Sequence, residues 1–243
     1  MEVRSDPEGQ LTLEGLENAE NLNGWIFETI KPFAIGKTIE IGSGIGNITS
    51  FFVKQGFEIT ATELREEYVN KLKSKFCIYP NCRVVQMDAS VADFDVINKS
   101  FLGCYDTIYT INVIEHIEDD RGVIRNASSM LRPGGKLIVL VPAYQSLYNK
   151  LDLSLGHYRR YSKRQLAVLF EQSGLTVERD FYFNFVGIFG WLISGKLQRN
   201  RLIPHQQIKL YNFLVPIFKF FDRLVFNRAG LSVICVGIKR LNI

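Results

Sequence analysis

Residues 38–49, with the sequence TIEIGSGIGNIT, place three glycines at alternate positions directly after an apolar run. The β-branched residues of the run predict a strand, and the residues after the glycines predict a helix. Gly42 can form the tight turn off the strand, Gly44 lets the backbone approach a ligand, and Gly46 lets the helix pack closely. This strand–turn–helix unit predicts a nucleotide-binding α/β domain.

Short β-branched runs alternate with helical patterns along the rest of the chain. The alternation predicts a single α/β domain over residues 1–243, a doubly wound and mostly parallel sheet with helices on both faces. Residues 184–230 separate the last two expected strands, and because structureless loops of that length are uncommon in compact domains, a helical insertion is expected there. Strands are expected at residues 38–41, 58–63, 83–87, 104–111, 136–142, 175–183 and 231–238. Helices are expected at residues 21–32, 46–55, 65–75, 118–130 and 163–173.

Polar residues stand in or directly after the first four expected strands. Glu40 precedes the first glycine by two positions, which gives E-x-G-x-G-x-G rather than the G-x-G-x-x-G of dinucleotide-binding turns. Glu63 ends the second strand, Asp88 follows the third, and Asn112 follows the fourth. A turn with the sequence LRPGG, residues 131–135, then introduces the fifth strand.

These ordered features resemble the motifs of class I S-adenosylmethionine-dependent methyltransferases. The resemblance implies a seven-stranded sheet in the order 3-2-1-4-5-7-6, with an antiparallel last pair, and S-adenosyl-L-methionine as cofactor. It implies that Glu63 accepts hydrogen bonds from the ribose hydroxyls and that Asp88 lies near the adenine amino group. The cofactor-binding residues that the resemblance implies are Glu40, Gly42, Ser43, Gly44, Gly46, Glu63, Leu64, Asp88, Ala89, Asn112, Val113 and Trp25.

Two further segments resemble a bacterial and archaeal subgroup of these enzymes that is linked with sugar, polysaccharide or lipid pathways. One is the GHYRRY segment, residues 156–161. The other is an N-terminal Asn-x-x-Trp element that ends at Trp25, although Leu22 stands where the element has asparagine. Asn21 and Asn23 flank that position, so the sequence leaves open which asparagine faces the cofactor.

The GHYRRY segment follows the fifth expected strand, at the edge of the sheet where ligands bind in open α/β folds. Methyl transfer from a sulfonium is an in-line displacement, so the protein mainly has to align the acceptor. His157 can take a proton from a hydroxyl, the tyrosines can orient the acceptor, and an arginine can clamp a carboxylate or phosphate. In the competing interpretation, one arginine pairs with Asp152 or a helix end and the tyrosines pack. The candidate catalytic residues are His157, Tyr158, Arg160 and Tyr161.

A metal site is not expected, although Glu115 and His116 follow the fourth strand. Some ubiquinone-type and RNA-end methyltransferases resemble this segment with E-x-x-E-H, which holds a divalent metal. Asn112 replaces the first of those glutamates here, and the loss of a carboxylate weakens a site for a hard cation. We therefore expect the pair to border the pocket without binding a metal.

The expected insertion differs in charge from the rest of the chain. Residues 183–230 contain seven basic residues and one acid, a net charge of +6 in a chain whose total is +4. The same stretch is dense in aromatic residues, yet neither of its apolar runs reaches the roughly 20 residues of a membrane span. Two interpretations are open. The insertion is either a helical cap that covers the core or a twin subunit, or an interfacial surface that meets anionic lipid or a lipid-linked substrate. A nucleic-acid partner is not expected, because no reading module is present.

The sequence therefore predicts a methyltransferase that acts on an oxygen or nitrogen of a small-molecule acceptor, such as a sugar, a lipid-linked compound or an isoprenoid-like compound. The alternative is a non-catalytic module that binds a partner or an anionic membrane through the insertion, and a homodimer is also compatible with the pattern. The polar start of the chain lacks a signal-peptide pattern, and the four cysteines lack zinc-site spacing. A cytoplasmic protein is expected, with contact to the inner membrane face as an extension of that expectation.

Overall fold

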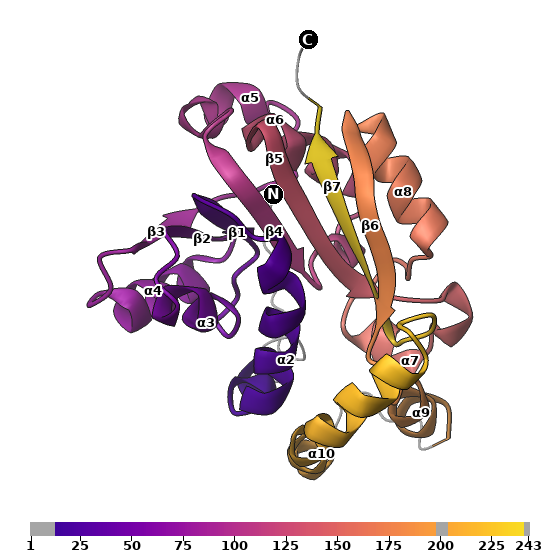
Figure 1. Cartoon of the computed structure of the whole chain (residues 1–243). Helices are drawn as coiled ribbons and strands as arrows, with labels where there is room; N and C mark the ends of the chain where they lie inside the picture. Colours follow the sequence, from indigo (N-terminus) through magenta and orange to yellow (C-terminus); the bar gives the residue numbers. More distant parts are fainter. Residues whose placement is uncertain (1–12, 198–203, 241–243) are drawn as a thin grey trace.

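The computed structural model describes residues 13–197 and 204–240, which contain a seven-stranded sheet in the order β3-β2-β1-β4-β5-β7-β6 (Figure 1). The first five strands run parallel, and β7 is antiparallel to both β5 and β6. The predicted fold class and strand order are confirmed. The strands are β1 Thr38–Ile41, β2 Ile59–Glu63, β3 Cys82–Gln86, β4 Tyr105–Ile111, β5 Leu131–Pro142, β6 Leu175–Phe183 and β7 Ser232–Lys239.

Side chains of each strand alternate between two hydrophobic clusters, one on each face of the sheet. In β5, Leu137 and Val139 face one cluster while Ile138 and Leu140 face the other. Because consecutive strand residues point to opposite faces, an apolar run such as this must be covered by helices on both sides. Helices α5 Phe94–Ile97, α6 Asp120–Met130 and α8 Lys163–Gln172 supply residues to the first cluster, and α2 Glu20–Ile30, α3 Thr49–Lys54, α4 Glu66–Phe76 and α10 His205–Leu224 supply residues to the second.

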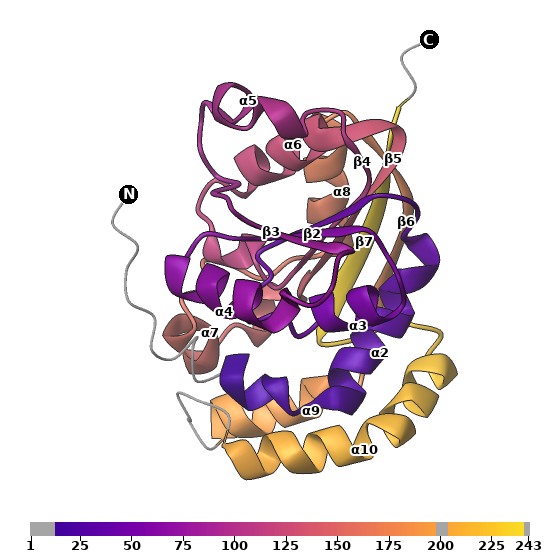
Figure 2. The ribbon, with the colours of Figure 1, turned by 90° about the vertical axis from the view of Figure 1, so that its left-hand side faces the viewer.

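The connection between β6 and β7 is helical over most of its described residues, as predicted. It contains α9 Gly187–Trp191, the π-helix η5 Leu192–Leu197 and the twenty-residue α10. Figure 2 shows α10 running beneath α2 at the lower end of the molecule. The shorter elements of the described chain are η1 Lys31–Phe33, η2 Lys99–Phe101, η3 Ile114–His116, η4 Gln145–Leu147 and α7 Lys150–Ser154.

Helix α10 is held at the end of β6 by hydrogen bonds as well as by packing. The buried carboxylate of Asp222 accepts hydrogen bonds from the backbone N–H groups of Asn184 and Phe185, both at 2.6 Å. The side-chain oxygen of Asn184 in turn accepts from the Tyr211 hydroxyl and from the Gly187 N–H. Burial raises the pKa of Asp222, although the two backbone donors oppose that shift. These bonds fix the inner face of α10 at the end of β6.

Across residues 13–197 and 204–240, we find no helix with both the length and the apolar character needed to cross a membrane. The longest helix of these described residues, α10, contains charged residues and Pro216 among its apolar residues.

Candidate active site

A cavity of about 860 Å³ lies where the carboxyl ends of the central strands meet the helical insertion. The glycine turn after β1 and the ends of β2, β3, β4 and β5 line its inner part. Residues of α2, α9, η5 and α10 line its outer part. This is the edge of an open α/β sheet at which ligands bind.

The glycine turn is held in place by the carboxylate of Glu63. One carboxylate oxygen accepts a hydrogen bond of 2.9 Å from the Gly44 N–H, and the other accepts one of 2.9 Å from the Leu64 N–H. Gly44 has a φ of 53°, a conformation that side chains with a Cβ rarely adopt. Glu63 therefore links the ends of β1 and β2 and presents its carboxylate to the cavity that it lines.

Gly46 does not line the cavity, so the structure does not bring this predicted cofactor residue to the site. Its φ is 81°, and a Cβ at this position would lie 2.7 Å from the Phe76 ring and 2.9 Å from Leu72. Both side chains belong to α4. Gly46 thus allows close packing between the turn and α4, which supports the site from behind.

Glu40 lies at the inner end of the cavity and is almost fully buried. Its carboxylate accepts a short hydrogen bond from the Thr49 hydroxyl. Burial raises the pKa of Glu40 to about 7, while hydrogen bonds such as that from Thr49 oppose the rise. A carboxylate poised in this way favours a cationic group at the inner end of the cavity, because the positive charge offsets the cost of burial.

The remaining predicted cofactor residues also meet at the cavity. Asp88 follows β3 and accepts hydrogen bonds from the N–H and hydroxyl of Ser90 at 2.8 and 2.5 Å. Asn112 follows β4 with a φ of 52°, an unusual conformation for a residue other than glycine, of the kind that clusters at functional sites. The structure brings the following predicted residues to the cavity: Glu40, Gly42, Ser43, Gly44, Glu63, Leu64, Asp88, Ala89, Asn112 and Val113.

Three buried residues around α7 form a charged cluster at the cavity wall. His157 Nδ1 lies 2.9 Å from Asp152 Oδ1, and Arg160 Nε donates to the same oxygen at 2.7 Å. Because an ionised carboxylate oxygen only accepts, the proton between the two groups resides on Nδ1, and in a neutral imidazole the Nε2 atom then carries the lone pair. Arg160 also donates to the Ala143 carbonyl at 3.1 Å, and its guanidinium lies over the Trp191 ring.

Electrostatics within this cluster favour an ionised Asp152. Burial opposes its ionisation, yet the hydrogen bond from His157 and the charge of Arg160 together hold the pKa of Asp152 below its usual range. Burial lowers the pKa of Arg160 against the pull of Asp152. The competing interpretation of the sequence, in which one arginine pairs with Asp152, describes what Arg160 does.

Both candidate tyrosines and Trp25 lie away from the cavity lining, so the structure does not bring these three predicted residues together with the others. The Tyr161 hydroxyl donates to Asp120 at 2.8 Å from within the core. Tyr158 is 55% exposed, beside the guanidinium of Arg159. The Trp25 ring packs 4.4 Å from the ring of Phe183. A large apolar ring is better buried against the sheet than left at a solvated ligand site.

Asn23 settles which of the two flanking asparagines reaches the cavity from α2. It lines the cavity and donates to the Leu16 carbonyl at 2.8 Å. Asn21 instead bonds to the Asn212 carbonyl of α10 at 3.0 Å. Residues three or four positions apart lie on one side of a helix, so Asn23 and Ile26 share the side of α2 that faces the cavity.

Glu115 is a further residue of the cavity wall, fully buried, and neither carboxylate oxygen has a hydrogen-bond partner among the described residues. Burial raises its pKa to about 8. One oxygen of Glu115 and one ring nitrogen each of His116 and His157 lie within 4.8 Å of one another. The nearby positive charge of Arg160 disfavours a cation there. The absence of a metal remains a prediction.

Comparison with known proteins agrees with this geometry. A model of a methyltransferase domain matches residues 19–179. A ubiquinone biosynthesis O-methyltransferase of Xanthomonas euvesicatoria is 24% identical over 155 residues, which span 58% of this chain and 63% of that relative. The fold and the glycine turn define the class of S-adenosylmethionine-dependent methyltransferases. The chain belongs to the methyltransferase domain family.

Solved structures share the fold at low sequence identity. A methyltransferase bound to the Haloferax volcanii Trm112 activator has a TM-score of 0.65 at 13% identity, with 95% of this chain and 93% of that chain covered. Phosphoethanolamine N-methyltransferase 2 of Haemonchus contortus has a TM-score of 0.61 at 15% identity, with 91% of this chain and 53% of that chain covered. The latter structure contains S-adenosyl-L-methionine. The predicted enzyme class and its cofactor are confirmed at the level of the family.

Proposed function

We propose that the protein transfers a methyl group from S-adenosyl-L-methionine to an oxygen or nitrogen of a small-molecule acceptor. The observation that supports this most directly is that the glycine turn and His157 line one cavity. The cofactor supplies an electrophilic methyl group when bound. The protein then has to hold the acceptor in line and exclude water.

In this proposal the inner half of the cavity binds the cofactor. Glu63 receives the ribose hydroxyls, Asp88 and Ala89 border the adenine, and Glu40 acts at the amino-acid end. Gly46 acts indirectly, by allowing α4 to pack behind this half of the cavity, and Trp25 acts indirectly by packing against Phe183 of the cavity wall. The remaining cofactor residues in the proposal are Gly42, Ser43, Gly44, Leu64, Asn112 and Val113.

His157 is the proposed general base. Its Nε2 atom takes the proton of an acceptor hydroxyl or ammonium, and the imidazolium that forms is stabilised by Asp152. Arg160 keeps Asp152 ionised and fixed, since its guanidinium is committed to that carboxylate and to the Ala143 carbonyl. Arg160 is therefore a positioning residue in this proposal, in place of the predicted clamp on the acceptor.

The acceptor is proposed to be a sugar, a lipid-linked compound or an isoprenoid-like compound. Beyond His157 the cavity is walled mainly by apolar side chains, which suit an acceptor with an apolar part. Among these side chains are Leu22, Ile26, Leu214 and Phe218.

Replacing His157 with glutamine is expected to lower the rate of methyl transfer about 100-fold or more, the scale of lost general-base catalysis. Transfer of label from methyl-labelled S-adenosyl-L-methionine into a lipid and polar-metabolite extract measures the rate. Tyr158→Phe is the matched control, because this neighbour is exposed outside the cavity lining and should retain full activity. Equal rates for His157→Gln and the wild type would remove His157 from the proposed mechanism.

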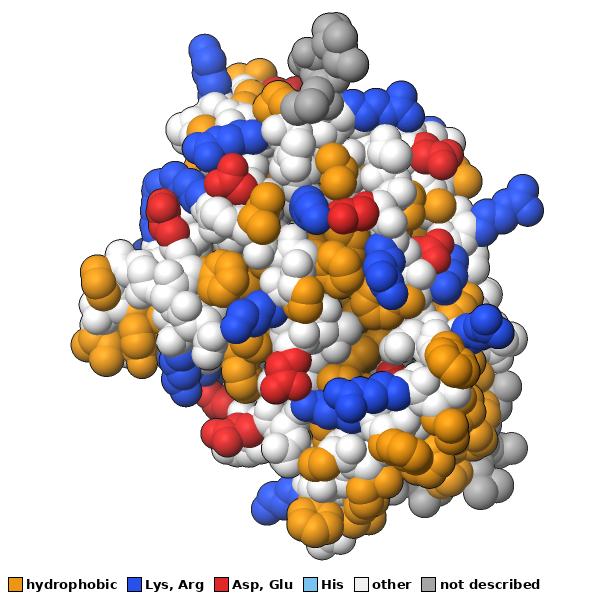
Figure 3. Space-filling view, in the orientation of Figure 1, with side chains coloured by type: hydrophobic (Ala, Val, Ile, Leu, Met, Phe, Trp, Pro, Cys, Tyr) orange, Lys and Arg blue, Asp and Glu red, His pale blue; other side chains and the backbone are white. Residues whose placement is uncertain are grey.

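The outer face of the insertion is proposed to contact an anionic membrane surface at the inner membrane face. Apolar residues recur every three or four positions along the outside of α10, and Phe213 among them is 75% exposed. Figure 3 shows the resulting apolar region at the lower right, over α9 and α10. We call this set the outer stripe; it comprises Leu210, Phe213, Ile217, Phe220 and Leu224.

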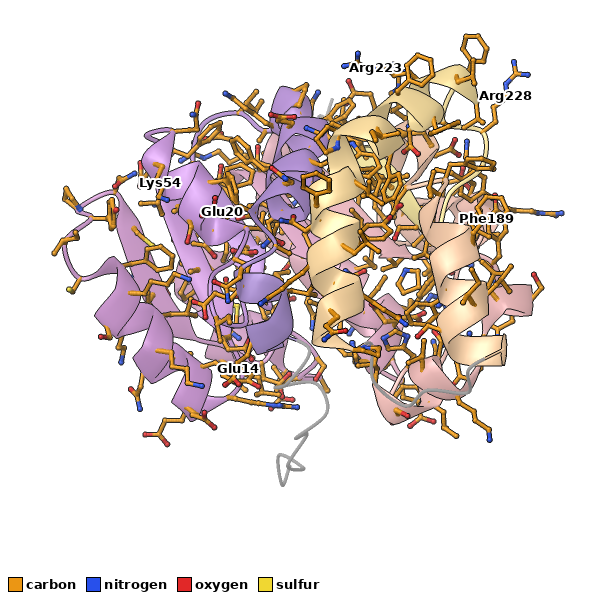
Figure 4. All side chains as sticks on the ribbon, turned by 90° about the horizontal axis from the view of Figure 1, so that it is seen from below. Glu14, Glu20, Lys54, Phe189, Arg223 and Arg228 are labelled. Atoms are coloured by element: carbon orange, nitrogen blue, oxygen red, sulfur yellow. The ribbon has the colours of Figure 1, made fainter. Side chains whose placement is uncertain are left out.

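Basic residues flank the outer stripe, as expected of a helix that lies in a lipid interface. Lys209 and Arg223 each precede a stripe residue, and both are exposed. Figure 4 shows Arg223 and Arg228 at the same end of α10. Lys219 is partly neutralised, because it pairs with Glu28 at 2.7 Å. Exposed apolar residues beside basic ones support contact with anionic lipid rather than with neutral lipid.

The triple variant Lys209→Glu, Arg223→Glu, Arg228→Glu is expected to lose binding to vesicles of phosphatidylcholine and phosphatidylglycerol, since each basic residue near such a surface contributes about 1 kcal/mol. Vesicle flotation measures the bound fraction. Lys73→Glu with Lys99→Glu, at exposed positions on other elements, is the control and should float as the wild type does. Retained flotation of the triple variant would refute electrostatic contact with the membrane. If light scattering gave twice the monomer mass for the wild type and the monomer mass for the variant, this face would instead be a homodimer interface.

A further inference from the structure

We propose that the outer part of the cavity binds a long apolar chain of the acceptor, with Gly190 leaving the room that the chain occupies. This inference rests on the proposed methyl transfer and narrows its acceptor to a compound with such a chain. The chain would lie between α2, α9, η5 and α10, with the reacting atom at His157.

The walls of this outer part come from helices far apart in the sequence. Leu22 and Ile26 line it from α2, and Leu214 and Phe218 line it from α10. Cavities of about 300–1,000 Å³ hold a drug-sized ligand, and this one, at about 860 Å³, lies near the upper end. The volume and the apolar walls suit a cofactor at the inner end together with a chain at the outer end.

The mouth of the cavity opens onto the apolar outer surface. Leu210 and Ile193 both line the cavity, and they are also 60% and 49% exposed. Leu210 belongs to the outer stripe as well as to the cavity wall. A chain that leaves a lipid surface at the outer stripe therefore meets Leu210 both at the surface and at the cavity wall.

Gly190 has no side chain to fill the cavity on the side formed by α9. Gly187, Gly190, Trp191 and Ser194 recur at the three-to-four-residue spacing of one helical side, and all four line the cavity. A Cβ placed on Gly190 would meet no heavy atom within 4 Å, whereas one on Gly187 would lie 2.6 Å from Asn184. Gly190 is itself exposed, so it lies on the wall near the opening of the cavity, and a large side chain there would narrow the chain-binding part without a clash in the backbone.

Phe189 offers a control on the same helix. It is exposed and outside the cavity lining, and Figure 4 shows it on the side of α9 turned away from α10. A change at this position alters the outer apolar surface without altering the cavity. It separates a chain held inside the protein from a chain adsorbed on its surface.

The test is a fluorescence titration with cis-parinaric acid, an apolar chain that becomes fluorescent when it is shielded from water. The wild type should bind the probe saturably, and Gly190→Phe should weaken binding by at least about tenfold, the scale on which a filled apolar pocket discriminates. Gly190→Ala and Phe189→Ala should both bind as the wild type does. Leu214→Trp, which fills the cavity from the opposite wall, should reproduce the loss.

Calorimetric titration with S-adenosyl-L-methionine accompanies each variant. Unchanged cofactor affinity in Gly190→Phe and Leu214→Trp shows an intact fold and a loss confined to the chain-binding part. Probe affinity that stays the same in both filled variants, or that falls in Phe189→Ala instead, would overturn the inference. A wild type that binds the cofactor but not the probe would overturn the inference alone, and one that binds no cofactor would overturn the proposed function.

Discussion

Replacing Asp152 with alanine is expected to lower the free energy of unfolding by about 3–5 kcal/mol, the cost of breaking a buried ion pair from one side. Asp152 is fully buried, and its removal would leave the guanidinium of Arg160, itself 1% exposed, without its anion. The same change removes the carboxylate that accepts from the Asn149 N–H at the start of α7. Urea denaturation followed by circular dichroism measures the loss.

The effect of this substitution is also expected to depend on pH. Burial raises the pKa of Asp152, but the bond from His157 and the charge of Arg160 reverse that shift and hold the pKa below the usual 3.8. The stabilisation from a carboxylate with a lowered pKa is complete above the unfolded-state pKa and is lost as the pH falls through the folded-state pKa. The difference between wild type and variant should therefore be full at neutral pH and shrink in strong acid.

Two controls bound this prediction. Asp152→Asn keeps a hydrogen-bond acceptor beside His157 and should destabilise less than alanine does. Glu171→Ala changes an exposed carboxylate and should stay within about 0.5 kcal/mol of the wild type. A loss below 1 kcal/mol for Asp152→Ala, or one that is equal at every pH, would contradict the buried pair as the main stabiliser of this segment.

Replacing Glu63 with alanine is expected to weaken S-adenosyl-L-methionine binding about 100-fold or more. The proposed pair of bonds to the ribose hydroxyls is charge-assisted, and each such bond contributes about 1.5–3 kcal/mol. The substitution also frees the Gly44 and Leu64 N–H groups that the carboxylate now fixes. Isothermal titration calorimetry measures the affinity.

Gly44→Asp should be at least as damaging, because it places a second carboxylate beside Glu63 at a φ of 53°. Glu66→Ala, three residues along at an exposed position of α4, is the matched control and should bind the cofactor normally. An intact protein that binds no S-adenosyl-L-methionine would end the methyltransferase proposal and favour the non-catalytic alternative. Unchanged affinity in Glu63→Ala would reject the role of this carboxylate alone.

Local patterns carried most of the fold. The β-branched runs at residues 38–41 and 58–63 became β1 and β2 nearly residue for residue. Each of these strands is predicted by its own short apolar segment, without information from the rest of the chain. The order of the strands was predicted from the resemblance to methyltransferases, because no local sequence pattern shows which distant strands pair.

Side-chain direction in irregular segments could not be predicted. In the GHYRRY segment, His157 faces the cavity, Tyr158 faces solvent and Tyr161 enters the core. No helical or strand period governs such a stretch, so residue type alone could not sort these roles. Asp152 was named only as a possible ion-pair partner, since the sequence does not show that the turn through Gly156 brings its carboxylate to both His157 and Arg160.

The outer face of α10 was invisible for a different reason. The sequence shows many aromatic residues at 211–221, and an apolar helix is normally read as having one buried side. The structure buries Val215 and Phe218 while leaving Phe213 and Ile217 exposed. Only the position of α2 and the sheet decides which of these sides is covered.

The insertion leaves and re-enters the sheet through neighbouring strands, since Phe183 at the end of β6 pairs with Ser232 at the start of β7. A segment with both ends fixed at adjacent positions can be exchanged, lengthened or shortened during evolution without disturbing the register of the sheet. In the proposed function residues 38–113 build the donor half of the cavity, so new versions of residues 184–230 are expected to change the acceptor while the donor half stays constant. Grafting this segment between related enzymes is a direct route to new acceptor preferences.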